Sequence, residues 1–115
     1  MTNIERLKVE IKGIKFTDDE INIYLQENEL EPTEEYNPTS KGNKRKILST
    51  ALNILESIAN NIELMKNYKT EDISVTQFSE NLEKRIDNLS RKIRQIPNDD
   101  EGYSDGATFV YMFDR

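Results

Sequence analysis

Residues 44–62, KRKILSTALNILESIANNI, decide the fold of this 115-residue chain. Apolar side chains return every three or four positions and form a wide stripe along one side of a helix, which is typical of a helix buried against several neighbours. We therefore predict a central helix from Lys44 to about Lys66, with Asn60–Asn61 as the place where it would break. The stripe consists of Ile47, Leu48, Ala51, Leu52, Ile54, Leu55, Ile58, Ala59 and Ile62.

A second long helix is predicted from about Thr76 to Gln95. Ser74 and Gln77 have the spacing of a capping box before it, and Pro97 stops it. The basic side chains of its final turns suit the negative end of the helix dipole. The residues expected to point inward are Phe78, Leu82, Ile86, Leu89, Ile93 and Ile96.

The N-terminal part predicts two shorter helices. Ile4, Leu7 and Ile11 lie on one side of the first, with Gly13 as a stop. Residues 17–20, TDDE, form a capping box for the second, which should end before the proline at position 32.

Two segments have no helical pattern. Residues 28–43 contain two prolines and a glycine and predict a long loop, and loops of this length are more often functional than idle. Residues 97–115 predict a flexible acidic extension that ends in a short apolar strand, for which residues 9–11 or 73–75 are the candidate partners. The expected fold is mainly α, a small bundle of about four helices in residues 1–96 followed by this extension.

The composition excludes most catalytic chemistry. The chain has no cysteine and no histidine, so disulfides, thiolate metal sites and Ser–His–Asp or Cys–His centres are impossible. No apolar run has the length of a membrane span, and the N-terminus does not resemble a signal peptide. We expect a cytosolic protein that is not an enzyme and uses no cofactor, metal or membrane.

Charge is distributed in blocks, although its sum of −6 disfavours a general nucleic-acid binder. Residues 17–37 hold eight acidic residues and no basic one, whereas residues 38–50 hold four basic residues and no acidic one. Such blocks either orient one subunit against the next or are solvated surface. The acidic triplets 18–20 and 99–101 lack the spacing of a calcium loop. The first suits a helix N-terminus, and the second is a solvated tail or a cation site.

Two groups of residues are candidates for partner contacts. The first is a basic cluster at the start of the central helix, Lys41, Lys44, Arg45 and Lys46. Positive charge at a helix N-terminus opposes the helix dipole, and this favours a role in binding an anionic partner. A solvated helix start is the simpler interpretation. The terminal segment either adds a strand to a partner or folds back on the helices. Its apolar residues are Phe109, Val110, Tyr111, Met112 and Phe113.

Three short segments carry a resemblance to a known family. Two of them are joined to the long helices, Leu55-Glu56-Ser57-Ile58-Ala59 and Asp72-Ile73-Ser74-Val75-Thr76, and the third is the acidic turn 17–20. In these segments the chain resembles the small head–tail connector (adaptor) proteins of tailed bacteriophages. The resemblance covers residues 17–96 and is a pattern of helices and phrases, not a diagnostic motif. The acidic stretch 17–37 and the terminal strand depart from the pattern.

The resemblance implies a structural subunit that is monomeric in isolation and forms a homo-oligomeric ring in the neck of the virion, after assembly in the host cytoplasm. The ring would dock below the portal protein, let DNA pass without sequence-specific binding, and carry the next neck or tail protein. Loop 28–43 and the extension would contact neighbouring subunits or the portal. Two alternatives stay open: a small acidic regulatory or inhibitory protein that mimics nucleic acid, and an enzyme that uses carboxylates and lysine.

Overall fold

The computed structural model describes residues 1–69 and 73–96, and these form a helical bundle. The α-helices are α1 (Asn3–Glu10), α2 (Asp18–Glu27), α3 (Lys41–Ala59) and α4 (Val75–Gln95), and a 3-10 segment, η1 (Ile62–Asn67), follows α3. In this part of the chain, strand-type pairing is limited to an isolated bridge between Thr2 and Glu35. The prediction of a mainly α bundle of about four helices is therefore confirmed.

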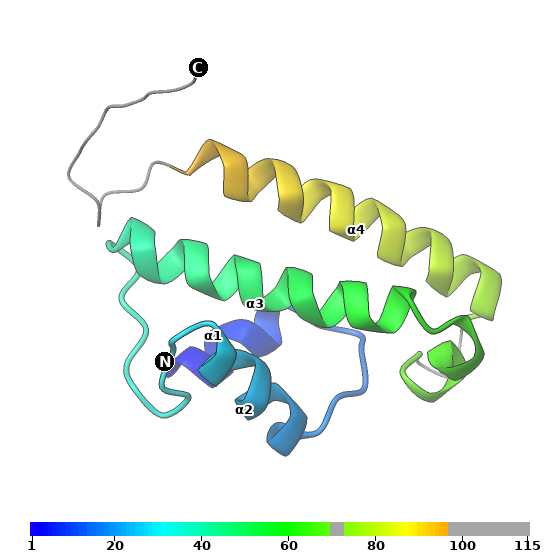
Figure 1. The fold of residues 1–115 in the computed structure, drawn as a ribbon, viewed down its shortest axis with the longest axis horizontal. Coiled ribbons are helices and arrows are strands. Elements are labelled where there is room, and N and C mark those ends of the chain that lie inside the picture. The colour runs from blue at the N-terminus through cyan, green and yellow to red at the C-terminus, as the bar shows by residue number, and fades with distance from the viewer. Residues whose placement is uncertain (70–72, 97–115) are drawn as a thin grey trace.

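Helix α3 is the centre of the bundle (Figure 1). Helix α4 covers one side of it, and α1 and α2 cover the opposite side, so that the molecule has three layers. Within the described part of the chain, α1 and α2 pack on α3 and on each other, but neither packs directly against α4. Each outer layer is therefore held mainly through α3.

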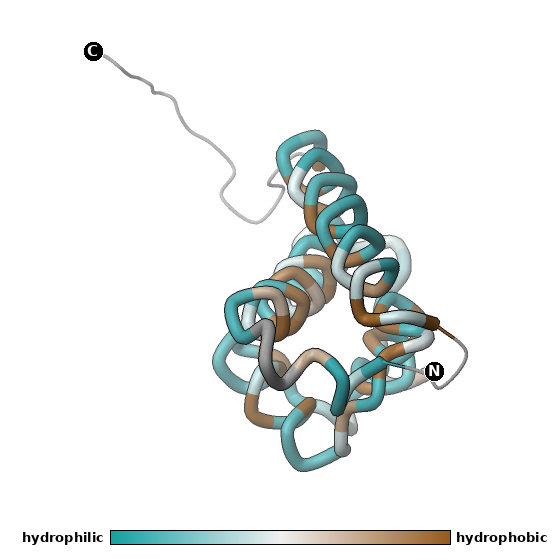
Figure 2. Tube along the Cα trace, turned by 90° about the vertical axis from the view of Figure 1, so that its right-hand side faces the viewer, coloured by the Kyte–Doolittle hydropathy of each residue, from teal (hydrophilic) through white to brown (hydrophobic). Residues whose placement is uncertain are grey.

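The core forms around the apolar stripe of α3. Six apolar residues of this helix are 2% exposed or less: Ile47, Leu48, Ala51, Ile54, Leu55 and Ile58. The surrounding elements each contribute smaller sets, and the inward-facing residues predicted for α4 all belong to this core or pack against it. Viewed roughly along α3 and α4, the outer helix α4 is largely hydrophilic, with hydrophobic residues at intervals (Figure 2).

The central helix differs at both ends from the range predicted for it. It begins at Lys41, because the Ser40 hydroxyl accepts a hydrogen bond from the Asn43 amide (3.0 Å) and caps the helix three residues early. It ends at Ala59, and η1 continues the chain after a break at Asn60–Asn61, so the single helix to Lys66 was wrong while the expected breakpoint was right. The predicted loop 28–43 accordingly ends at residue 40.

The predicted capping box of α2 is confirmed. The Thr17 hydroxyl accepts from the Glu20 amide (3.2 Å), and the Glu20 carboxylate accepts from the Thr17 amide (3.2 Å). At the start of α4, Ser74 accepts from the Gln77 amide (3.1 Å), but within the described residues the Gln77 side chain returns no bond, so only half of that box forms. The strand partners considered at 9–11 and 73–75 were also wrong, since α1 runs to Glu10 and α4 starts at Val75.

Helix α2 ends in a Schellman motif. The Leu30 amide donates to the Leu25 carbonyl (2.9 Å), and the Glu29 amide donates to the Gln26 carbonyl (3.0 Å). Leu30 and Leu25 are both buried, which supplies the hydrophobic contact of the motif. Glu29 has a φ of 64°, a left-handed conformation in which glycine is the usual residue.

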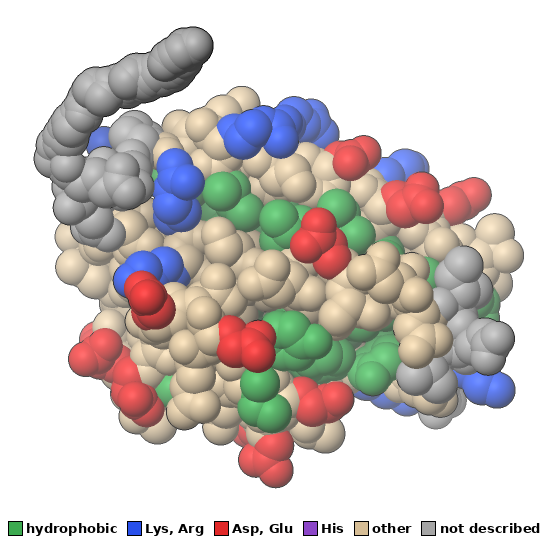
Figure 3. All heavy atoms as spheres, viewed as in Figure 1, with side chains coloured by type: hydrophobic (Ala, Val, Ile, Leu, Met, Phe, Trp, Pro, Cys, Tyr) green, Lys and Arg blue, Asp and Glu red, His purple; other side chains and the backbone are tan. Residues whose placement is uncertain are grey.

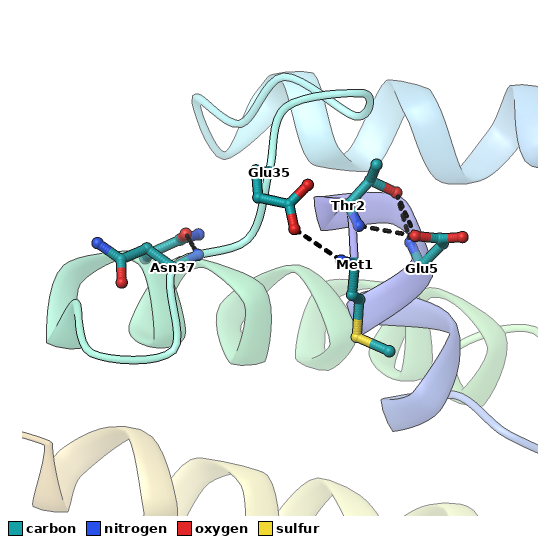
Figure 4. Close-up of polar contacts among 6 residues, drawn as sticks. Met1, Thr2, Glu5, Glu35 and Asn37 are labelled. Carbon is teal, nitrogen blue, oxygen red and sulfur yellow. Dashed lines mark hydrogen bonds and ion pairs between the residues drawn. The ribbon is translucent and has the colours of Figure 1, made fainter.

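The loop after α2 lies against the N-terminus instead of extending into solvent (Figure 4). The amides of Asn3 and Ile4 donate to loop carbonyls at residues 34 and 32 (2.9 and 3.1 Å), and the Tyr36 amide donates to the carbonyl of Met1 (2.9 Å). The Met1 amino group lies 2.7 Å from a Glu35 carboxylate oxygen. These bonds hold the loop backbone against the N-terminus, while many of its side chains are exposed.

Candidate functional site

The basic cluster predicted from the sequence occupies the first two turns of α3. Lys41 and Lys44 are exposed, whereas Arg45 is partly buried and its guanidinium donates to the carbonyl of Ile96 at the end of α4. The ammonium group of Lys46 lies 3.5 Å from a Glu29 carboxylate oxygen. The cluster thus divides into two exposed lysines, an arginine that is bonded to the end of α4, and Lys46, which forms an exposed ion pair.

A second basic group lies beside the first because α3 and α4 are antiparallel (Figure 1). The start of α3 and the end of α4 meet, as the bond from Arg45 to Ile96 requires. We call this region the basic end. It consists of Lys41, Lys44, Arg45 and Lys46 from α3 and Arg91, Lys92 and Arg94 from α4.

A hollow of about 420 Å³ opens at the basic end between α1, α3 and α4. Its charged lining consists of Arg6 and Glu10 from α1, Lys44 from α3 and Lys92 from α4. Arg6 and Glu10 form an ion pair at 3.0 Å, and the Arg6 guanidinium also lies 5.4 Å from the centre of the Tyr36 ring. The other two cations of the lining, Lys44 and Lys92, form no ion pair with a described residue.

The hollow continues along α4. A recess of about 150 Å³ shares Glu10 and Lys92 with it, and a further one of about 180 Å³ shares Arg85 with that recess. The three hollows lie in a row between α1 and α4, two helices whose backbones do not come close to each other. We call this row the α1–α4 groove, and its mouth is the part lined by Arg6, Lys44 and Lys92.

Arg85 spans the α1–α4 groove. Its guanidinium donates to the carbonyls of Glu10 and Lys12 (3.1 Å for Lys12) at the C-terminal end of α1. Burial lowers the pKa of Arg85, and the nearby Glu10 carboxylate partly opposes this shift. An arginine remains charged at neutral pH, so Arg85 ties α4 to the negative end of the α1 dipole.

A chain of amide side chains fixes the start of α3 and hence the basic end. The buried Asn3 donates to the Glu31 carbonyl (2.9 Å) and accepts from the Asn43 side chain (3.2 Å). The oxygen of Asn43 in turn accepts from the Asn37 amide (2.8 Å). This network holds α1, the loop and α3 in one arrangement, because each buried polar group in it has a partner.

The densest acidic stretch, residues 17–37, lies in α2 and the loop, and α4 carries further acidic residues before the basic end. Figure 3 shows Asp and Glu side chains over the half that contains α1, α2 and the loop and also over the part of α4 away from the basic end, while Lys and Arg are prominent at the basic end. Of the first acidic triplet, Asp18 pairs with Lys8 (2.9 Å) and Glu20 closes the capping box. Glu20 therefore has the role expected at a helix start, while Asp18 links α2 to α1.

Several sequence-based candidates lie outside the described residues. These are the terminal residues Phe109 to Phe113 and the second acidic triplet, 99–101. Across residues 1–69 and 73–96, no group of three metal-binding side chains converges and no helix is both long and apolar enough to cross a membrane. Comparisons with protein-family models, with curated proteins and with solved structures found no match.

Sequence reasoning missed the α1–α4 groove and the contributions of Arg6, Arg85 and Lys92. The basic turns at the end of α4 were interpreted only as partners of the helix dipole. Antiparallel packing of the two long helices would have placed residues 41–46 beside residues 91–94. Nothing in the sequence indicates that α1 stands apart from α4, because that spacing depends on how each helix packs on α3.

Proposed function

We propose that this chain is a non-catalytic structural subunit of the head–tail connector, or neck, of a tailed bacteriophage. Its ring would dock below the portal protein and link the DNA-filled head to the tail. Two facts support this proposal: the phrases at residues 55–59 and 72–76 that resemble connector proteins, and the helical bundle that such a resemblance implies.

The observation that carries the assembly role is the separation of charge. The basic end lies at one end of the α3–α4 pair, whereas most acidic residues of 18–35 lie on α2 and the loop, where, among the described residues, Glu29 alone is paired with a residue of the basic end, Lys46. A subunit with opposite charges on two different surfaces suits a head-to-tail contact, the type of interface that closes into a ring. Such contacts set orientation more than strength, which agrees with a subunit that is monomeric until the portal gathers it.

The same charges suit a channel through which DNA moves. A net charge of −6 disfavours tight, general binding of DNA, and a conduit must not retain the DNA that it carries. In this arrangement the acidic surfaces tolerate the passing duplex while the basic end contacts protein. The exposed side chains of loop 28–40 supply contacts to neighbours or to the portal, and so does the C-terminal segment 97–115.

The test is assembly on a portal. The full chain is mixed with the portal protein encoded in the same genome, and the products are examined by native mass spectrometry and electron microscopy. We expect the original chain to form rings on the portal. A variant with Lys41→Glu and Lys44→Glu should not form them. Rings should return when that variant is mixed with a second one that carries Glu31→Lys and Glu34→Lys. A chain that stays monomeric with the portal present overturns the proposal.

The acidic-inhibitor alternative predicts a different result. A nucleic-acid mimic would bind a DNA-binding protein in competition with DNA, and its binding would depend on the carboxylates of residues 18–35 and not on the basic end. Fluorescence competition with a labelled duplex separates the two proposals without requiring a ring.

A further inference from the structure

The mouth of the α1–α4 groove has more positive charge than its walls neutralise. Of its three cations, Arg6 pairs with Glu10, whereas Lys44 and Lys92 form no ion pair with any described residue. The two lysines come from different helices and face one hollow of about 420 Å³. Like charges brought together by folding repel each other, so a negative group between them would stabilise the arrangement.

The chain leaves the described structure at this same place. Ile96 is part of the wall of the mouth, and Arg45 holds its carbonyl oxygen. The residues that follow are acidic, with Asp99, Asp100, Glu101 and Asp105 and no basic residue before Arg115. Asp99 is three residues from Ile96, and three extended residues span about 10 Å.

We propose that the mouth of the α1–α4 groove binds the acidic segment 98–105 of the same chain. The occupant is identified by its charge and by its position, because the segment starts at the rim of the hollow it would fill. Lys44 and Lys92 bind its carboxylates, and the pair of Arg6 and Glu10 forms the far wall. This inference goes beyond the proposed function and does not depend on it.

The same chain is a better source of the segment than a second copy. A short tether gives the segment a local concentration in the millimolar range, which a free neighbour reaches only in an assembled particle. The contact is exposed to solvent, so it should weaken as ionic strength rises and the Debye length falls to about 8 Å at physiological salt. Bound in this way, the segment occupies Lys44 and therefore competes with the neighbouring subunit that the proposed function places at the basic end.

Paramagnetic relaxation is the direct test, since the chain has no cysteine of its own. A nitroxide is attached to the full chain at Ser104→Cys, and amide signals are recorded at low salt. We expect strong broadening of the amides around Lys44 and Lys92, little broadening in α2, and recovery of the signals in high salt. Broadening spread evenly over the bundle, or confined to the last residues of α4, overturns the proposal.

A mixing experiment distinguishes one chain from two. Spin-labelled chain without ¹⁵N is mixed with ¹⁵N chain without the label, so that only contacts between copies broaden signals. We expect no broadening in this mixture. Broadening at Lys44 and Lys92 there would overturn the intramolecular contact and assign the mouth to the segment of a neighbour.

Matched charge variants control for net charge. One variant removes three charges from the segment, with Asp99→Asn, Asp100→Asn and Glu101→Gln, and keeps the nitroxide at position 104. This variant should show no broadening of the amides around Lys44 and Lys92. A control variant removes the same number of charges from exposed residues away from the mouth, with Glu27→Gln, Glu31→Gln and Glu34→Gln. The control variant should keep the broadening. Equal loss in both variants would show a general charge effect and overturn the proposed site.

The groove side is tested in the same way. Lys44→Gln with Lys92→Gln should abolish the broadening, whereas Lys66→Gln with Lys84→Gln, two exposed lysines outside the mouth, should preserve it. The amide spectra of all four variants report folding independently of the contact. Persistence of the contact in the Lys44 and Lys92 variant would exclude the mouth as its site.

Discussion

The two sides of α3 are covered in different ways. On one side, α1 and α2 have 8 and 10 residues, too short to be stable as isolated helices, and they are fixed by capping boxes, a Schellman motif and backbone bonds to the loop. On the other side, α4 is a 21-residue amphipathic helix that packs through an apolar stripe. Its side-chain hydrogen bonds to other described elements come from Arg85, and Arg45 of α3 binds the chain just beyond it.

The two sides thus combine local polar bonds and apolar packing in different proportions. Short helices need many specific bonds because each one buries few side chains, whereas a long helix is held by its repeated apolar contacts. The difference also explains the α1–α4 groove, because α1 and α4 both pack on α3 and are joined to each other by the Arg85 side chain, not by close backbone packing.

The substitutions with the largest expected effect on the free energy of unfolding test whether the two sides of α3 fold as one unit. Leu55 in α3 and Leu82 in α4 are each 1% exposed or less. Replacing either with alanine leaves a cavity, and we expect each variant to lose about 2 to 5 kcal/mol of unfolding free energy. Urea denaturation followed by circular dichroism measures the loss.

The shape of the transition is the informative result. If α4 is part of the cooperative core, Leu82→Ala shifts a single transition without changing its slope. A separate early transition in Leu82→Ala, absent from Leu55→Ala, would mean that α4 detaches while the other three helices stay folded.

A smaller effect is expected where the two sides touch. Arg85→Met keeps the apolar stem but removes the hydrogen bonds to the carbonyls of Glu10 and Lys12. Because burial of the guanidinium offsets part of its hydrogen bonding, we expect a loss of roughly 1 to 2 kcal/mol. Lys84→Met, an exposed neighbour on α4, is the control and should change little. An unchanged stability of Arg85→Met would mean that this bridge contributes nothing beyond the packing on α3.

The elements with strong local signals were predictable from sequence. The stripe of residues 47–58, the box at 17–20 and the stop after residue 95 each depend on residues close in sequence, and the structure follows them. The start of α3 was placed three residues late because the Ser40 cap was not recognised. The capping box of Thr2 and Glu5 was missed in the same way, although its spacing is identical to that of Thr17 and Glu20.

The candidate site was predictable only in part. The basic cluster of α3 is visible as a run of letters, but its division into exposed and bonded residues depends on contacts with residues 29 and 96. The α1–α4 groove depends on tertiary packing between segments about 80 residues apart, and no local pattern encodes it. Long-range geometry was the missing information, and a single sequence does not supply it.

A stabilising change is expected at the end of α2. Glu29 is left-handed with φ of 64°, a conformation that costs an ordinary residue roughly 1 to 2 kcal/mol. Glycine removes this strain but adds freedom to the unfolded chain, so we expect Glu29→Gly to gain about 0.5 to 1 kcal/mol in thermal or urea unfolding.

Glu29→Gln separates the backbone effect from the charge. This variant keeps the left-handed residue and removes only the exposed contact to Lys46, so its stability should stay close to that of the original chain. A gain in Glu29→Gln equal to that in Glu29→Gly would attribute the effect to relief of acidic repulsion and not to the helix end.

The smallest expected effect is the acid sensitivity of the α1 cap. The Thr2 amide donates to the Glu5 carboxylate at 2.7 Å, and this bond, followed by that from the Thr2 hydroxyl, lowers the pKa of Glu5 below its ordinary value of 4.5. A carboxylate whose pKa is lowered in the folded state stabilises the protein at pH values above its ordinary pKa, and this contribution disappears as the pH falls through the folded-state pKa.

Glu5→Gln cannot titrate, so we expect its melting temperature to fall less than that of the original chain as the pH is lowered from 5. Thr2→Ala keeps the backbone donor and should give an intermediate slope. Equal slopes in all three proteins would mean that α1 is held by its packing on α3 alone, in the manner of α4, and the contrast between the two sides would then not extend to this helix start.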